Sequence, residues 1–269
     1  MPSQGFLYIA TGRRFIAEAV ESVASLRSHM PGAATCCFTD EPGLAAPHFD
    51  QVFLIAEPFR NFFEKIPPLS RTPFDRTIFV DTDTTFAAPM MDVFLLLGRF
   101  ELAVVADPFW CEMPGLPACF AQMNTGLIAY QRTPRVLAFF GRWFETYQGE
   151  FRRSGCERSY HDQSSFQRAL YESDVRFYLL PNEYNLRLSC PQLIRIWAPA
   201  RMLHARHKDI AKLGPRLNSR SDVRVVWPNV MHFCRSDIFV IDAFVDRVLQ
   251  SLLMVLRKSL RLSMSWRRA

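Results

Sequence analysis

The sequence predicts an α/β protein with a mostly parallel, doubly wound central sheet, and three segments near its start carry this prediction. Residues 5–11 and 34–39 form short apolar runs of the kind found in strands that are buried on both faces. Between them, residues 13–29 carry apolar side chains at helical spacing on one stripe. A strand, a helix and a second strand in this order are typical of a doubly wound sheet.

The remaining elements follow in order along the chain. Pro31 and Gly32 end the first helix, and helical spacing returns over residues 59–69 before a turn at 71–75. Further strands are predicted at 51–55, 77–80, 102–106, 125–130, 175–180 and 201–204. Further helices are predicted at 91–97, 134–147 and 162–172, and a proline-rich surface loop at 108–117.

The last predicted element is a long amphipathic helix over residues 237–262, and basic residues crowd the chain after it. We therefore divide the chain into an α/β domain over 1–236 and a C-terminal amphipathic basic helix over 237–269. The apolar face of such a helix either packs on the core or lies on a membrane surface. Packing on the core is the preferred interpretation, and membrane contact stays open.

Composition and charge exclude several classes of protein. Apolar residues make up 49% of the chain, which is enough for a substantial core. The net charge of +6 suits phosphorylated ligands or acidic membranes. No basic stripe with interleaved aromatic residues runs through the body of the chain, so we expect no nucleic-acid partner.

The cysteines and the N-terminus indicate a cytoplasmic location. None of the seven cysteines forms a C-x-x-C pair, and no secretory signal is recognisable, so we expect reduced thiols. No run of eighteen uncharged apolar residues occurs, so we expect no helix that spans a membrane. The protein is therefore expected in the cytoplasm, with contact at the inner face of the membrane as a second expectation.

The motif that carries chemistry is Asp81-Thr82-Asp83, which directly follows the predicted strand at 77–80. In open α/β sheets, ligands bind outside the carboxyl ends of the strands. Two carboxylates at this place point to a hard cation, because Mg²⁺ and Mn²⁺ prefer oxygen ligands and share them with substrate phosphates. In a transferase, such a cation would neutralise a leaving diphosphate. The plainer interpretation is a turn whose aspartates cap the next helix.

A second enzyme class fits the same motif. In haloacid dehalogenase-like phosphatases, an aspartate that ends a strand is the nucleophile, and an aspartate two residues later is the general acid and base. Asp81 and Asp83 would take these roles. The phosphatase motif usually opens a chain, whereas several βα elements precede it here. A non-catalytic binding module is a third interpretation, but both aspartates are intact.

Four segments of the chain, in a shared order, resemble one enzyme family. They are Tyr8-Ile9-Ala10-Thr11-Gly12, residues 65–83, Asn124-Thr125-Gly126 and His161-Asp162-Gln163. Together they resemble the GT-A-fold glycosyltransferases, above all the glycogenin-like and bacterial galactosyltransferase-like enzymes of family 8. The resemblance covers roughly residues 5 to 207. It implies a Rossmann-like GT-A sheet, a UDP-sugar donor, a Mn²⁺ or Mg²⁺ ion and retention at the anomeric carbon.

The resemblance also implies roles for single residues. Asp81 and Asp83 would bind the metal. Donor contacts would come from a set spread over the chain, namely Ala10, Thr11, Gly12, Lys65, Asp81, Thr82, Asp83 and Arg206. Catalytic contacts to the reacting sugar or the acceptor would come from Asn124, Asp162 and Gln163. The acceptor would be a glycan, a lipid or a protein, and the loop with Phe109 and Trp110 is a candidate wall for it.

In this family a late histidine completes the metal shell. His204 is our choice, because it ends a strand-like run with Arg206 close by, and His232 is the rival. The Lys-Pro-Trp that follows the family's histidine is absent here. Structural interpretations stay open beside the functional ones: Asp162 as a helix N-cap, Asn124 in a turn before a strand, and Lys65 in solvent.

Overall fold

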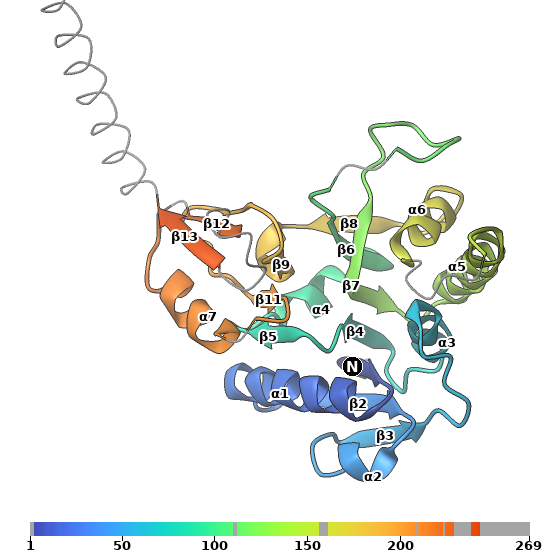
Figure 1. Cartoon of the computed structure of the whole chain (residues 1–269), viewed down its shortest axis with the longest axis horizontal. Helices are drawn as coiled ribbons and strands as arrows, with labels where there is room; N and C mark the ends of the chain where they lie inside the picture. The colour runs from blue at the N-terminus through green and yellow to red at the C-terminus, as the bar shows by residue number, and fades with distance from the viewer. Residues whose placement is uncertain are drawn as a thin grey trace, which may run out of the picture.

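The computed structural model describes residues 3–109, 112–155, 161–207, 209–222, 224–228 and 238–242. At its centre is a seven-stranded sheet with the order β3-β2-β1-β4-β7-β6-β8 (Figure 1). Its strands are β1 (Gln4–Ala10), β2 (Ala34–Thr39), β3 (Gln51–Leu54), β4 (Arg76–Val80), β6 (Leu102–Ala106), β7 (Met123–Gln131) and β8 (Phe177–Leu180). Only β7 runs antiparallel to its neighbours. The predicted α/β class with a mostly parallel sheet is confirmed.

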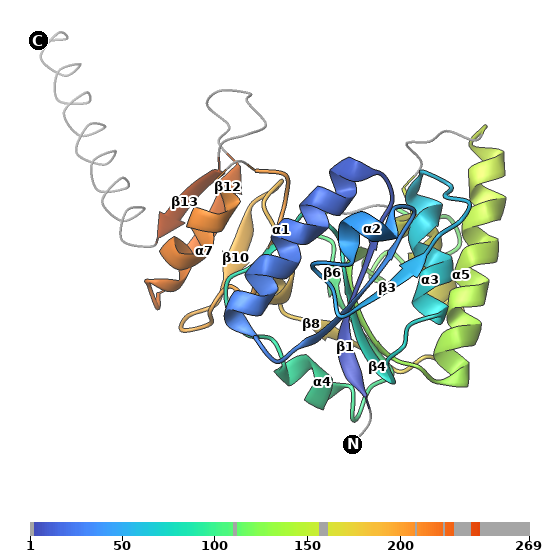
Figure 2. The ribbon, with the colours of Figure 1, turned by 90° about the horizontal axis from the view of Figure 1, so that it is seen from below.

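Helices cover both faces of this sheet (Figure 2). One core joins the sheet to α1 (Arg13–His29), α2 (Pro42–Ala45) and α4 (Asp92–Leu96). The other joins it to η1 (Phe62–Lys65), α3 (Ile66–Ser70), α5 (Pro134–Arg153) and α6 (Gln163–Tyr171). The predicted helix at 59–69 is therefore split into two short pieces, and α5 continues six residues beyond the predicted end at Tyr147.

The reversed direction of β7 shapes the edge of the sheet that follows β4. Val80 is paired with Leu127, and the amide of Asp81 donates to the carbonyl oxygen of Gly126 at 3.0 Å. Because β7 is antiparallel to β4, its first residues lie where β4 ends. The Asp81-Thr82-Asp83 and Asn124-Thr125-Gly126 segments therefore lie side by side.

Two three-stranded sheets lie beside the main one, and most of their strands come from residues 182–228, which we call the small lobe. The first contains β5 (Thr84–Phe86), β11 (Met202–His204) and β9 (Leu186–Arg187), and the second contains β10 (Gln192–Ile194), β12 (Arg224–Pro228) and β13 (Ile238–Asp242). The small lobe also holds η2 (Asn182–Tyr184) and α7 (Ile210–Asn218) and has its own apolar core.

The helix predicted over residues 237–262 is wrong at its start. Ile238–Asp242 form β13, which pairs antiparallel with β12. Four of its five residues are β-branched or aromatic, which suit a strand, and periodicity does not separate a strand from a helix over so few residues. Residues 243–269 lie outside the described residues. Among the described helices, none combines the length and the hydropathy needed to cross a bilayer.

Candidate active site

A series of buried hydroxyl groups anchors the loop that follows β4. The Thr84 hydroxyl donates to the carbonyl oxygen of Asp81 at 2.8 Å, Ser22 Oγ lies 2.7 Å from Thr84 Oγ1, and Tyr8 Oη lies 3.1 Å from Ser22 Oγ. A carbonyl oxygen only accepts, so each hydroxyl in the chain donates towards the loop. This chain ties the backbone of Asp81 to β1 and α1 and leaves its carboxylate facing the pocket.

The third member of the cluster arrives from a distant part of the sequence. β11 pairs antiparallel with β5, which starts directly after Asp83, so that His204 is opposite Thr84. The amide of Ala205 donates to the carbonyl oxygen of Asp83 at 3.0 Å. His204 Nε2 thereby lies 3.4 Å from Asp83 Oδ1 and 3.9 Å from Asp81 Oδ2.

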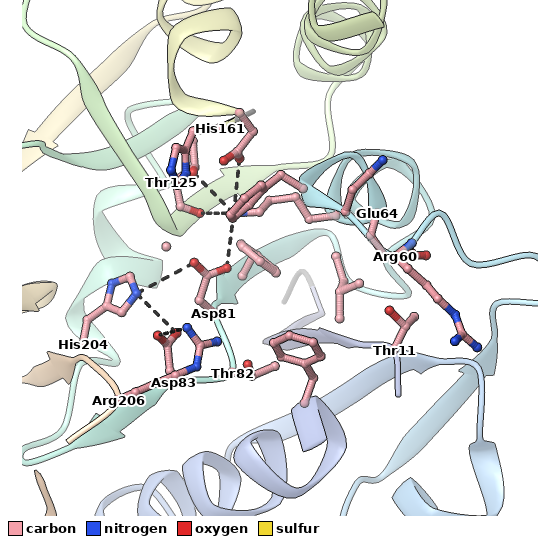
Figure 3. A pocket seen from close by; sticks show the side chains of 18 of the residues that line it. Thr11, Arg60, Glu64, Asp81, Thr82, Asp83, Thr125, His161, His204 and Arg206 are labelled. Atoms are coloured by element: carbon pink, nitrogen blue, oxygen red, sulfur yellow. Dashed lines mark hydrogen bonds and ion pairs between the residues drawn. The ribbon is translucent and has the colours of Figure 1, made fainter. Parts of the chain in front are cut away.

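This cluster has the chemistry of a divalent-cation site (Figure 3). One carboxylate oxygen of Asp81, one of Asp83 and one ring nitrogen of His204 lie within 4.8 Å of one another. Oxygen and imidazole ligands together suit Mn²⁺, and the carboxylates alone suit Mg²⁺. Three protein ligands leave coordination positions for water or a substrate oxygen. The donor set therefore fits the ion that the sequence analysis expected.

A relay of two amides fixes the orientation of His204. Asp107 Oδ2 accepts a hydrogen bond from Asn124 Nδ2 at 3.1 Å. Asn124 Oδ1 then accepts from Asn185 Nδ2 at 2.8 Å, and Asn185 Oδ1 lies 2.9 Å from His204 Nδ1. A carboxylate only accepts, so this order of donors places the ring hydrogen on Nδ1 of His204. In a metal-bound state, the Nε2 lone pair would face the cation, whereas a hydrogen bond from Nε2 to Asp83 requires the imidazolium.

Lys65 stands on the other side of Asp81. Its Nζ is 3.3 Å from Asp81 Oδ1, 3.2 Å from Asp162 Oδ2 and 3.3 Å from Thr125 Oγ1. Burial by itself lowers the pKa of Lys65, but the charges of Asp162 and Asp81 outweigh it and raise that pKa above its ordinary value. The interpretation of Lys65 as a solvated side chain is wrong, because the residue is buried.

The two aspartates of the motif have opposite protonation behaviour. Burial raises the pKa of Asp81, and the charges of Lys65 and His204 only partly oppose that effect. Burial also tends to raise the pKa of Asp83. The hydrogen bond and charge of His204 and the charge of Arg206 outweigh this effect and lower that pKa. Asp83 is therefore held as a carboxylate, which is the form a metal needs.

Asp162 and Gln163 begin α6 beside the same pocket. Asp162 is at the N-cap position, yet its side chain accepts no cap hydrogen bond and reaches Lys65 instead. The interpretation of Asp162 as a helix cap is therefore wrong. Asp162 Oδ2 is buried and makes no well-formed hydrogen bond, so it keeps capacity to accept one. Gln163 Nε2 donates to Asp107 Oδ2 at 2.8 Å.

Asp107 is a residue of this site that the sequence reasoning missed. It is buried and accepts hydrogen bonds from Asn124, Gln163 and Arg187. Its place directly after β6, at the carboxyl end of a strand, is the signal that pointed to Asp81 after β4. Asn185 was also missed, and only its tertiary contacts mark it. Asn124 lies inside β7 rather than in a turn before a strand.

Arg206 lies on the outer side of the carboxylates. Its guanidinium is 3.3 Å from Asp83 Oδ2 and 2.9 Å from Glu18 Oε1. Glu18, on α1, also accepts a hydrogen bond from the Thr82 hydroxyl at 3.0 Å. Arg206 is thus held beside Asp83 by a residue of the first helix, and Thr82 is turned towards that helix rather than towards the other motif side chains.

Most of the predicted site residues line one pocket of about 690 Å³. Among those that the structure describes, Ala10 and Phe109 are not in the pocket wall: Ala10 is buried in the core and Phe109 is half exposed. The others are brought together, namely Thr11, Gly12, Lys65, Asp81, Thr82, Asp83, Asn124, Asp162, Gln163, His204 and Arg206. The Arg187 guanidinium lies 5.6 Å from the ring of Phe109, whereas Trp110 and His232 lie outside the described residues.

Comparison with known proteins does not identify a family for this chain. No protein-family model matches the chain, and no curated protein matches it.

Proposed function

We propose that the protein is a metal-dependent glycosyltransferase that moves a sugar from a nucleotide-diphosphate donor, such as a UDP-sugar, to an acceptor hydroxyl. The observation that supports this best is the convergence of Asp81, Asp83 and His204 within 4.8 Å at the wall of one pocket. The cluster follows β4 at the carboxyl end of a mostly parallel sheet, where α/β proteins bind their ligands.

The residues around the cluster suit an anionic donor. Asp81, Asp83 and His204 would hold Mn²⁺ or Mg²⁺, which supplies positive charge next to a leaving diphosphate. Arg206, fixed by Glu18, presents a guanidinium on the same side. Arginine donors in fixed positions bind phosphate oxygens well, because their forked geometry matches them.

The opposite wall suits a sugar. Asp162 offers a buried carboxylate oxygen with unused capacity to accept a hydrogen bond. Asp107 orients the side-chain amides of Gln163 and Asn124, which line the pocket together with the carboxylate of Asp162. Such groups read sugar hydroxyls by paired hydrogen bonds. We infer that this wall positions the transferred sugar, with retention at the anomeric carbon as the family resemblance implies.

The phosphatase reading is the alternative, and the electrostatics favour it less. A general acid needs a pKa near the working pH, whereas the pKa of Asp83 is lowered by His204 and Arg206 against the effect of burial. This shift opposes the general-acid role that a phosphatase would require of Asp83.

The experiment is a panel of nucleotide-sugar donors incubated with and without Mn²⁺, with release of nucleotide diphosphate as the readout. Release should require the metal and should vanish in Asp83→Ala. Asp222→Asn removes a carboxylate of the small lobe that pairs with Arg220 outside the pocket, and it should leave release unchanged. If the protein instead hydrolyses simple phosphate esters, and Asp81→Asn abolishes that hydrolysis, the transferase proposal is wrong.

A further inference from the structure

The small lobe is strongly basic, unlike the part of the chain before it. Residues 1–181 contain 16 lysines and arginines against 20 acidic residues, whereas residues 182–228 contain nine against three. Residues 229–269 add seven against three, so that the net charge of +6 arises from the last third of the chain. An asymmetry of this kind favours a negatively charged partner on the side of the small lobe.

Three large apolar side chains of the small lobe are exposed within five residues of sequence. Leu193 is 50% exposed, Ile196 51% and Trp197 80%. Leu193 lies on the face of β10 opposite to that of its buried neighbours Gln192 and Ile194. Single exposed apolar residues are common, but a cluster that includes a tryptophan indicates an interaction surface. We call these three residues the Trp197 patch.

The backbone conformation of Trp197 is a second, independent indication of an interaction surface. Its φ is 60°, in the left-handed region that bulky residues avoid, and its amide donates to the carbonyl oxygen of Ser221 at 2.6 Å. Its side chain is largely exposed, so packing within the chain does little to offset this conformation. A residue held in an unfavourable conformation without internal packing points to a contact outside the chain.

Cationic side chains border the patch. Arg195 precedes Ile196 directly, and its side chain is 59% exposed. Arg220 precedes Ser221, the residue bonded to Trp197, and its side chain is 48% exposed. Tryptophan and aliphatic side chains next to arginines suit the boundary between lipid headgroups and acyl chains, where the indole sits at headgroup level and the guanidinium meets lipid phosphates.

We propose that the Trp197 patch docks the small lobe on an anionic lipid surface. The apolar side chains enter the headgroup region, while the excess positive charge of the lobe attracts acidic lipids. This contact is distinct from the one considered for the C-terminal segment, which lies outside the described residues, and it does not depend on the transferase activity. It would hold the enzyme next to acceptors that are themselves in the membrane.

The test is flotation of the full-length chain with vesicles of phosphatidylcholine alone and of an equimolar mixture with phosphatidylglycerol. Binding should require the acidic lipid and should weaken as salt rises, because exposed charges are screened. Trp197→Asn should lower the partition coefficient about tenfold, as expected for loss of one large apolar contact. Asparagine tolerates a positive φ, so the variant should keep the wild-type melting temperature.

Leu54→Asn is the matched control, because Leu54 is 55% exposed on β3, at the opposite end of the main sheet from β8. It should leave binding unchanged. Equal binding by Trp197→Asn and the wild type would overturn the proposal. So would binding that is lost only when the arginines of residues 257–268 are replaced. A dimer in light scattering that disappears in Trp197→Asn, without vesicle binding, would assign the patch to a second copy instead.

Discussion

The imidazole of His204 lies against the α-carbon of Gly126 and leaves no room there for a side chain. A Cβ atom at position 126 would lie 2.2 Å from Cε1 of His204 and 2.7 Å from its Nδ1. It would also lie 2.9 Å from Oδ1 of Asn124. Gly126 therefore sets how closely the ring approaches the carboxylates of Asp81 and Asp83.

We expect Gly126→Ala to lower the affinity for Mn²⁺ by at least about tenfold, because the methyl group would displace His204, the proposed metal ligand, and its orienting amide. Isothermal titration with Mn²⁺ measures this. Gly141→Ala is the control, since nothing lies within 4 Å of a Cβ at that position on α5. It should keep the affinity and raise the stability by about 0.5–1 kcal/mol. Wild-type affinity in Gly126→Ala would contradict the proposed role of His204.

Asp107→Asn tests the amide relay that ends on His204. An amide at position 107 can donate as well as accept, so it no longer dictates which ring nitrogen of His204 carries the hydrogen. We expect a second imidazole tautomer in ¹⁵N spectra and about a tenfold loss of Mn²⁺ affinity. Arg187→Gln breaks the ion pair with Asp107 but keeps the carboxylate, so it should keep the tautomer. A single, unchanged tautomer in Asp107→Asn would refute the relay.

Lys65→Met would leave a buried carboxylate, Asp162, and a half-buried one, Asp81, without their shared cation. Removing one partner of a buried ion pair destabilises proteins by about 3–5 kcal/mol. We expect a loss of this size in urea denaturation without metal and a smaller one with saturating Mn²⁺. Lys212→Met is the control, because Lys212 pairs on the surface with its side chain 82% exposed, and its loss should have almost no effect. Equal losses in both variants would count against the buried network.

Glu101 gives the fold a pH-dependent contribution. Burial acts to raise its pKa, but the amide of Arg176 at 3.1 Å and the Arg135 guanidinium at 2.9 Å outweigh it, and the pKa is lowered. A carboxylate with a lowered pKa stabilises the fold above its unfolded-state pKa, and this stabilisation disappears as the pH falls through the folded-state value.

We therefore expect Glu101→Gln to destabilise the protein by about 1–3 kcal/mol at neutral pH, with the difference shrinking as the pH falls below about 4. Urea denaturation over a pH series measures it. Glu145 is exposed on α5, and Glu145→Gln should show no such dependence. A destabilisation that stays constant to low pH would show that the charge of Glu101 contributes nothing.

Arg224 holds the small lobe together from within. It is 1% exposed, and all five of its N–H groups donate to backbone carbonyl oxygens. These belong to Asp222, Leu217, Arg220, Arg195 and Ala198. Lysine has three donors, so Arg224→Lys leaves carbonyl groups unpaired, and we expect a loss of about 3 kcal/mol. Proteolysis within residues 182–228 should speed up, whereas the exposed Arg216→Lys should behave as wild type.

The main sheet was predictable because its signal is local. The apolar runs that became β1, β2 and β4 are buried on both faces, so their sequences lack polar interruptions. The two aspartates were found for the same reason, since a strand that ends in acidic residues is visible in the sequence. Predicted and observed boundaries of α1 and β2 agree.

What the sequence does not show is pairing between distant segments. β5 is only three residues long, and its partner β11 follows most of the other strands in the sequence. No local sequence pattern therefore indicates that His204 lies next to Asp83. From the sequence alone, Glu18 on the polar side of α1 is expected to lie in solvent, whereas in the structure it pairs with Arg206. Such contacts are set by packing of the whole chain rather than by the residues around them.

The three residues of the proposed metal site come from distant parts of the sequence, and this bears on how the protein is made. Asp81 and Asp83 leave the ribosome with the first half of the chain, whereas His204 emerges only after the main sheet has all its strands. A nascent chain that stalls before β11 carries the carboxylates without their histidine and without the strand that closes on β5. If the cluster binds a cation as proposed, binding would require synthesis of the chain through β11.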